Sequence, residues 1–180
     1  MKYPLFILIG LRLGLFTSCS NNYKYFTEDL YDEYRWTNNE LERIQFYVSE
    51  DIVLYREFSG DDTRITDGKI RVEDGREVEE VIIEKGTPGV FVQSPKKDRF
   101  AISFEDDPAN FLMFGPNPKA RGRFVLLAKE WNRRAGKVTY ADRQWNTSSA
   151  SAYAALMVDI KLARKTKYNS KKAEGKRVGS

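Results

Sequence analysis

The stretch LERIQFYVSEDIVLYREF, residues 41–58, decides how the rest of the chain can fold. Between residues 44 and 48 every second side chain is apolar, which is typical of a strand that buries one face. Ser49-Glu50-Asp51 has the small and acidic composition of a tight turn. Residues 52–58 are rich in β-branched and aromatic side chains, so they predict a returning strand. We therefore expect an antiparallel hairpin here.

The same alternation continues along the chain in short segments. Asp74-Gly75 separates predicted strands over 69–73 and 77–84, and this dipeptide favours a hairpin turn because glycine readily takes positive φ. Glu79-Glu80 interrupts the apolar pattern of the second strand, which favours a sheet edge or a bulge there. Further strands are predicted over residues 90–92, 99–104, 111–114, 124–128, 137–140 and 143–146.

Residues 111–114 (FLMF) are apolar throughout and do not alternate with polar side chains. A strand of this kind is expected to be buried on both faces or to lie at the centre of a barrel. The whole pattern amounts to about ten short strands with turn signals roughly every eight to twelve residues. It predicts a mostly β fold, a single antiparallel β-sandwich or small β-barrel, rather than a βαβ arrangement.

Both ends of the predicted domain depart from this pattern. Thr27-Glu28-Asp29 predicts the start of a short N-terminal helix that runs to Trp36, with a capping threonine and acids in its first turn. Residues 153–162 alternate as a strand does; their alanines also suit a helix, and we favour the strand. The chain beyond is almost without apolar side chains, so 163–180 is predicted to be a disordered basic tail after a β-rich domain over 27–162.

The composition is that of a globular protein, with 41% hydrophobic and 13% aromatic residues among 180. Charge is unevenly distributed. Residues 20–160 hold 20 basic and 25 acidic groups, whereas residues 161–180 hold eight basic groups and one acid. An acidic body argues against a nucleic-acid partner. The tail suits an anionic lipid or cell-wall polymer, or it only adds solubility. Its predicted contact residues are Lys165, Lys167, Lys171, Lys172, Lys176 and Arg177.

The chain has no histidine and only one cysteine, Cys19. It therefore lacks the residues for a histidine-dependent triad, for a Cys/His zinc site and for an internal disulfide. Glu105-Asp106-Asp107 is the densest acidic cluster, but Pro108 interrupts the regular ligand spacing of a calcium loop, so we interpret it as a solvated turn. We expect no enzymatic activity, no cofactor and no metal, with a carboxylate-based hydrolase as the minor alternative.

One group of residues has the composition of a binding surface. Aromatic rings beside cations suit stacking on sugars or an energetic hot spot for a protein partner. The alternative is that the tryptophans lie in the core and the arginines in solvated loops. The candidate residues are Trp131, Arg133, Arg134, Tyr140 and Trp145.

The N-terminus has a basic start, an apolar run of 13 residues over 4–16 and then Thr17-Ser18-Cys19. The run is too short to span a bilayer, which takes ~20 residues, and it fits a cleavable signal core. The stretch resembles the signal peptide of bacterial lipoproteins. The resemblance implies removal of 1–18, lipidation of Cys19 and a lipidated tether over 19–26. Ser20 after the cysteine implies, by analogy, an outer-membrane lipoprotein that faces the periplasm. The alternatives are plain secretion or a buried N-terminal strand with a free cysteine.

These observations lead to two functional hypotheses. The first is a membrane-anchored envelope lipoprotein that acts as a non-enzymatic accessory or scaffold subunit, with a protein partner. The second is a β-barrel lipoprotein that binds a lipid or glycan in its interior. An apolar cavity lined by phenylalanines would favour the second hypothesis; the candidates are Phe100, Phe104, Phe111 and Phe114.

Overall fold

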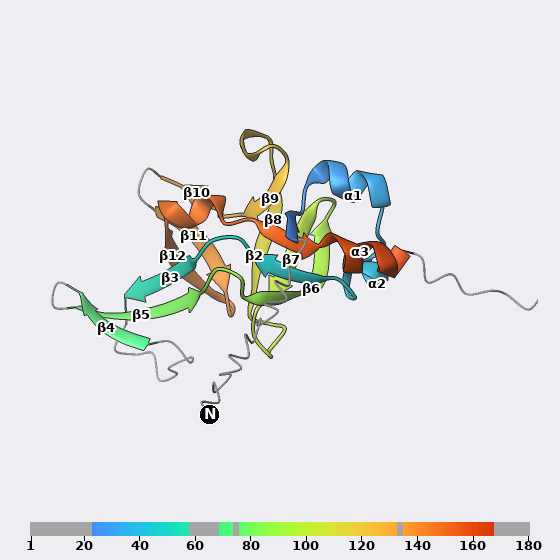
Figure 1. Cartoon of the computed structure of the whole chain (residues 1–180). Coiled ribbons are helices and arrows are strands. Elements are labelled where there is room, and N and C mark those ends of the chain that lie inside the picture. Colours follow the sequence, from blue (N-terminus) through green and yellow to red (C-terminus); the bar gives the residue numbers. More distant parts are fainter. Residues whose placement is uncertain (1–22, 58–68, 74–75, 133–134, 168–180) are drawn as a thin grey trace, which may run out of the picture.

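The computed structural model describes residues 23–57, 69–73, 76–132 and 135–167, and Figure 1 shows their arrangement. Two antiparallel sheets dominate it, so the predicted mostly β fold is confirmed; the sheets form a sandwich, and the described strands do not close a barrel. The seven-stranded sheet is ordered β1 (Tyr23–Tyr25), β13 (Leu156–Asp159), β2 (Gln45–Val48), β6 (Pro88–Lys96), β7 (Arg99–Ser103), β8 (Phe111–Asn117) and β9 (Arg123–Leu126). The six-stranded sheet is ordered β10 (Glu130–Trp131), β11 (Ala135–Tyr140), β12 (Arg143–Ser148), β3 (Ile52–Glu57), β5 (Arg76–Ile83) and β4 (Lys69–Glu73).

Both strands predicted in the opening stretch are present, as β2 and β3, but the predicted hairpin is wrong. β2 pairs with β13 and β6, whereas β3 pairs with β5 and β12, so the chain passes from one sheet to the other between them. Ser49 fixes this crossing: its backbone N–H donates to the Ala155 carbonyl, and its Oγ accepts from the Ala155 N–H, each at 2.9 Å. The alternation still buries one face of each strand because both strands face the same core.

The seven-stranded sheet curls so that its last strand returns toward its first. Isolated bridges join Thr27 to Arg123 and Val125 to Ala155. The concave face is filled by aromatic rings that pack mainly edge to face or tilted, with centroids 4.8–5.3 Å apart for Phe100–Phe124, Phe26–Phe124 and Phe26–Phe46. These rings are fully buried. They form the centre of the core, which we call the aromatic layer.

Three short helices gather at one end of the molecule, and the β4–β5 hairpin extends from the opposite end (Figure 1). The predicted N-terminal helix is present as α1 (Glu28–Tyr34), and Thr27 Oγ1 accepts from the Leu30 N–H at 3.1 Å as expected of a cap. α2 (Asn38–Leu41), which was not predicted, follows it. Single 3-10 turns occupy Pro118–Ala120 and Ser149–Tyr153.

The ambiguous segment 153–162 contains both of the predicted alternatives. Leu156–Asp159 is strand β13, and α3 (Ile160–Lys167) begins directly after it. The Asp159 carboxylate accepts from the N–H groups of Lys161 and Leu162, at 2.9 and 3.3 Å, and so caps the helix. The predicted tail therefore begins as helix, and residues 168–180 lie outside the described part.

Candidate ligand-binding cleft

Strand β8 has an apolar sequence because both of its faces pack in apolar surroundings, which differ between the two faces. Leu112 and Phe114 are fully buried in the core, while Phe111 and Met113 on the other face are half-buried. Phe111 and Met113 line a cleft of about 480 Å³ between β8 and β11 of the other sheet. Burial on both faces was predicted, and the second face proves to be the wall of this cleft.

A short crossing segment, residues 127–129, forms the corner of the cleft. Its first residue, Leu127, donates its N–H to the Met113 carbonyl of β8 at 2.8 Å. Two residues later, Lys129 donates its N–H to the Lys137 carbonyl of β11, also at 2.8 Å. The crossing segment is thus hydrogen-bonded to both sheets within three residues. Val138 of β11 completes the apolar lining.

The rim of the cleft is cationic. Lys96 and Arg99 stand at the β6–β7 turn and Lys129 at the crossing segment, and no acidic side chain is among the lining residues. A Cβ added at Gly115 would lie 2.9 Å from Leu127 Cδ1 and 3.4 Å from Arg99 Cδ. The absence of a side chain at Gly115 therefore lets the Arg99 stem and Leu127 lie against β8.

This combination suits one class of ligand. Ligand pockets of 300–1,000 Å³ are commonly apolar with a few polar groups that fix orientation. Here the apolar walls offer room for an acyl chain or a ring, and the three cations attract a carboxylate, sulfate or phosphate head. The chemistry of the cleft therefore fits an amphipathic anion.

The cleft is not the predicted cavity lined by phenylalanines. Of its four residues only Phe111 lines the cleft. Phe100 and Phe114 are fully buried in the core, and Phe104 is half-buried with its ring 6.1 Å from that of Phe114. These side chains fill the interior instead of lining a shared space.

The predicted binding surface is divided by the structure. Tyr140 and Trp145 are buried, with 2% and 1% of their surface exposed, so they do not belong to an exposed surface. Trp131 is 39% exposed, and Arg133 and Arg134 lie outside the described residues. The spacing along the sequence could not separate these cases, because the strand register of β11 and β12 decides which ring faces the core.

Trp131 sits at a second, smaller cavity at the β10 edge of the six-stranded sheet. Its ring lies against Gly136, where an added Cβ would be 2.6 Å from two indole carbons. The cavity is about 320 Å³ and is lined mainly by polar side chains, which include Glu130, Lys137 and Asn146. The partly exposed indole thus packs on the backbone of Gly136, its register partner.

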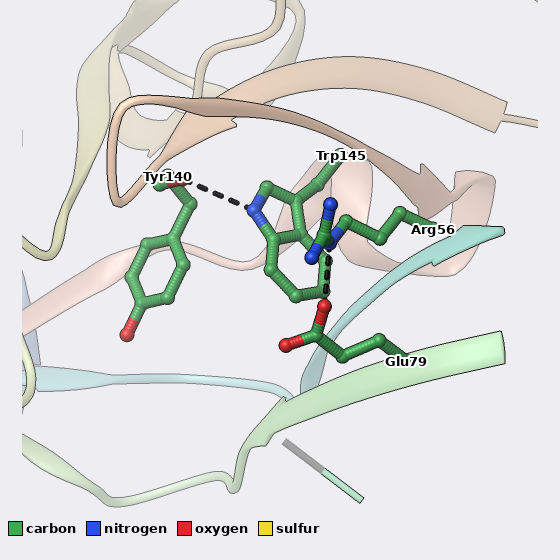
Figure 2. Close-up of polar contacts among 4 residues, drawn as sticks. All are labelled: Arg56, Glu79, Tyr140 and Trp145. Atoms are coloured by element: carbon green, nitrogen blue, oxygen red, sulfur yellow. Dashed lines mark hydrogen bonds and ion pairs between the residues drawn. The ribbon is translucent and has the colours of Figure 1, made fainter. Parts of the chain in front are cut away.

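Tyr140 and Trp145 instead belong to a buried polar cluster with Arg56 and Glu79 (Figure 2). Trp145 Nε1 donates to the Tyr140 carbonyl at 3.0 Å. The Arg56 guanidinium lies 5.3 Å from the centre of the Trp145 ring, and its Nε donates to Glu79 Oε2 at 2.5 Å. The four residues lie on four adjacent strands, β11, β12, β3 and β5, and the side chains of Trp145, Arg56 and Glu79 share one face. Within the cluster Trp145 Nε1, Arg56 Nε and Glu79 Oε2 are paired with neighbours, whereas Glu79 Oε1 is buried without a hydrogen-bond partner.

Glu79 corrects the prediction for its strand. The acidic pair at 79 and 80 suggested a sheet edge or a bulge, yet β5 lies between β3 and β4 in regular register, with Arg56 directly opposite Glu79. Glu79 is fully buried. A carboxylate tolerates such burial only with a charged or hydrogen-bonding partner, and Arg56 provides it.

The acidic loop after β7 is held by Tyr140. The Tyr140 hydroxyl donates a short hydrogen bond to Glu105 Oε1, and Asn110 Nδ2 donates to the other carboxylate oxygen at 2.6 Å. Burial, followed by the hydrogen bond to Glu105 and by its negative charge, raises the pKa of Tyr140 well above its usual range. The loop of the acidic cluster is therefore fastened to the six-stranded sheet. Among the described residues no group of acidic side chains or cysteines could hold a metal ion.

The remaining predicted residues lie at the two ends of the chain. Lys165 is exposed on α3, and Lys167 ends this helix. Cys19, Lys171, Lys172, Lys176 and Arg177 lie outside the described residues. Within the described ranges, no helix has both the length and the apolar character needed to cross a bilayer.

Comparison with family models, with curated proteins and with solved structures finds no match to this chain.

Proposed function

We propose that the protein is a non-enzymatic envelope lipoprotein whose β domain binds an amphipathic anion in the cleft between its sheets. The observation that carries the proposal is the pairing of apolar walls, Phe111, Met113 and Val138, with a rim of three cations and no acid. This is the second of the sequence hypotheses, with the binding space between the sheets instead of inside a barrel.

The energetics favour a ligand that is part apolar and part charged. Each methylene buried against the walls contributes about 0.8 kcal/mol. The rim cations are exposed, so each is worth little as an isolated ion pair. Their main effect is to orient the ligand, with its head at Arg99 or Lys129 and its chain against β8. A neutral ligand would leave the rim without a counter-charge.

Binding of laurate to the purified protein tests the cleft. We expect displacement of an anilinonaphthalene sulfonate probe by laurate, and about tenfold weaker binding in the Arg99→Gln/Lys129→Gln variant, which corresponds to ~1.4 kcal/mol. Ala128→Phe fills the cleft and should abolish binding. Lys85→Gln, a remote exposed lysine, is the matched control. Equal laurate binding in the Ala128→Phe variant would exclude the cleft as the site.

The anchor belongs to the proposal because of the N-terminal resemblance. A lipidated Cys19 would hold the domain at the envelope, with the outer membrane and the periplasmic side expected from Ser20. Labelling of cells with radioactive palmitate tests it: the wild type should carry label, and Cys19→Ala should not. Equal label in both would remove the anchor and leave the cleft untouched.

The accessory-subunit hypothesis has one observation in its favour. Trp131 is an exposed aromatic side chain that packs against Gly136, and such residues often anchor a protein partner. Affinity purification from solubilised envelopes after cross-linking tests it. A partner that wild type retains and Trp131→Ala loses would support this role, and a partner set common to both would contradict it.

A further inference from the structure

The described chain begins close to the proposed lipid anchor. Tyr23, the first residue of β1, follows Cys19 by four residues. Because an extended residue spans at most ~3.3–3.6 Å, the two cannot be more than about 14 Å apart. A lipid on Cys19 would therefore keep the β1 edge of the seven-stranded sheet within this distance of the membrane.

The outward face at this edge is aromatic. Tyr25 and Tyr47 both lie opposite Met157 in the register, and Tyr23 lies opposite Asp159, so the three tyrosines share one face. Tyr23 and Tyr25 are 37% and 36% exposed, and the rings of Tyr23 and Tyr47 are 4.5 Å apart. We call Tyr23, Tyr25, Tyr47 and Met157 the tyrosine face. On the opposite face, Val158 of β13 and Phe46 of β2 are fully buried core residues, whereas Lys24 of β1 is exposed.

A basic helix starts at the same place. α3 follows Asp159 directly, and Asp159 is the register partner of Tyr23. The helix buries Ile160 and Ala163 and leaves Leu162 55% exposed. Its other described exposed side chains include Lys161, Arg164 and Lys165, all cations. Asp159 at this junction accepts hydrogen bonds from the first turn of α3 and so caps the helix.

We propose that the tyrosine face and α3 together rest on an anionic membrane surface, so that the lipid anchor holds the domain in one fixed orientation. The proposal rests on the proposed lipidation of Cys19. Tyrosine rings suit the boundary between headgroups and acyl chains. Leu162 would enter that boundary, as apolar residues of interfacial helices do, and the lysines would meet lipid phosphates. A protein partner would not require these features to coincide with the exit of the tether.

Depth-dependent quenching tests the orientation. Gln45→Cys places a thiol on the tyrosine face, and Gln144→Cys, the matched control, places one on β12 of the other sheet. Each lipidated protein is labelled with a fluorescent maleimide and reconstituted into vesicles of phosphatidylcholine and phosphatidylglycerol that contain a nitroxide lipid. We expect quenching at position 45 and little at 144. Equal quenching at both positions, or quenching only at 144, would overturn the proposal.

The unsubstituted protein separates this outcome from failure of the anchor. An acylated Cys19 cannot react with the maleimide, so the unsubstituted protein should remain unlabelled. If it is labelled, the anchor is wrong and the orientation falls with it. If it is not labelled and quenching is equal at positions 45 and 144, the anchor holds and only the orientation is wrong.

Charge removal tests the contribution of α3. In the Gln45→Cys background, Lys161→Gln/Lys165→Gln should reduce quenching on vesicles with phosphatidylglycerol and have no effect on vesicles of phosphatidylcholine alone. Lys85→Gln/Lys97→Gln removes two exposed lysines elsewhere and should leave quenching unchanged. Loss of quenching in the control pair, or none in the α3 pair, would contradict a specific role for this helix.

Discussion

The two sheets bury their inner faces by different means. The seven-stranded sheet packs the aromatic layer, in which Phe26, Phe100 and Phe124 contact one another without polar groups. The six-stranded sheet buries a tryptophan together with an ion pair, Arg56 and Glu79. Shape complementarity stabilises the first region, and the second also depends on oriented hydrogen bonds and charge. Substitutions should therefore act differently in the two regions.

The largest effect is expected in the aromatic layer. Phe100 is fully buried and contacts at least four other rings. Phe100→Ala should lower the free energy of unfolding by about 3–5 kcal/mol because it removes buried surface and leaves a cavity. Urea denaturation followed by circular dichroism measures the loss. A change below about 1 kcal/mol would show that this layer is loosely packed.

The ion pair should give the next largest effect. Glu79→Leu removes the carboxylate that faces the buried Arg56 guanidinium and should cost about 3 kcal/mol. The double variant Arg56→Leu/Glu79→Leu should regain most of this loss, because it leaves no buried charge without a partner. Chemical denaturation of the wild type, both single variants and the double variant gives the coupling energy. Additive losses would mean that the pair does not act as a unit.

Tyr140 should show a smaller loss. Tyr140→Phe keeps the buried ring but removes the hydrogen bond to Glu105, and a bond to a charged group is worth about 1.5–3 kcal/mol. The lower end is expected because Glu105 is exposed and can be rehydrated. Amide hydrogen exchange in the loop 104–110 should also become faster. Unchanged exchange there would show that the loop is fixed by other contacts.

The smallest effect concerns alkaline pH. A raised pKa in the folded state means that Tyr140 keeps its proton when the unfolded chain loses it, at about pH 10. Stability from this group is fully present below that pH and declines above it, by at most ~1.4 kcal/mol per pH unit. The pKa values of Tyr31 and Tyr47 are also raised, chiefly by burial for Tyr31 and by the hydrogen bond with Tyr23 for Tyr47. Denaturation series from pH 8 to about pH 11 should therefore show a shallower decline for Tyr140→Phe than for the wild type.

Local patterns predicted the strands but not all of their partners. The turn at Ser49-Glu50-Asp51 has the same composition whether the chain returns in one sheet or crosses to another. The choice depends on Ala155, 106 residues away, which bonds to Ser49. In the same way Glu79 suggested an edge because its partner Arg56 lies 23 residues earlier on another strand.

The cleft was only partly visible in the sequence. The apolar run of β8 predicted burial on both faces. Leu112 and Phe114 are buried, but Phe111 and Met113 are only half-buried because they line the cleft. Arg99 and Lys129 complete the cleft with their positive charges. In the sequence, Arg99 begins a predicted strand and Lys129 lies in a predicted loop. Only the tertiary fold places them around the same space. The two tryptophans at 131 and 145 were equally ambiguous, since each has arginines nearby in the sequence.

The crossing segment 127–129 has a mechanical consequence. The same three residues wall the cleft and join the two sheets, through the amides of Leu127 and Lys129. A ligand bound against these residues would stiffen the connection between the two sheets and so oppose their relative sliding. Ligand binding in the cleft would then slow hydrogen exchange at these two amides and restrict the sliding of one sheet against the other.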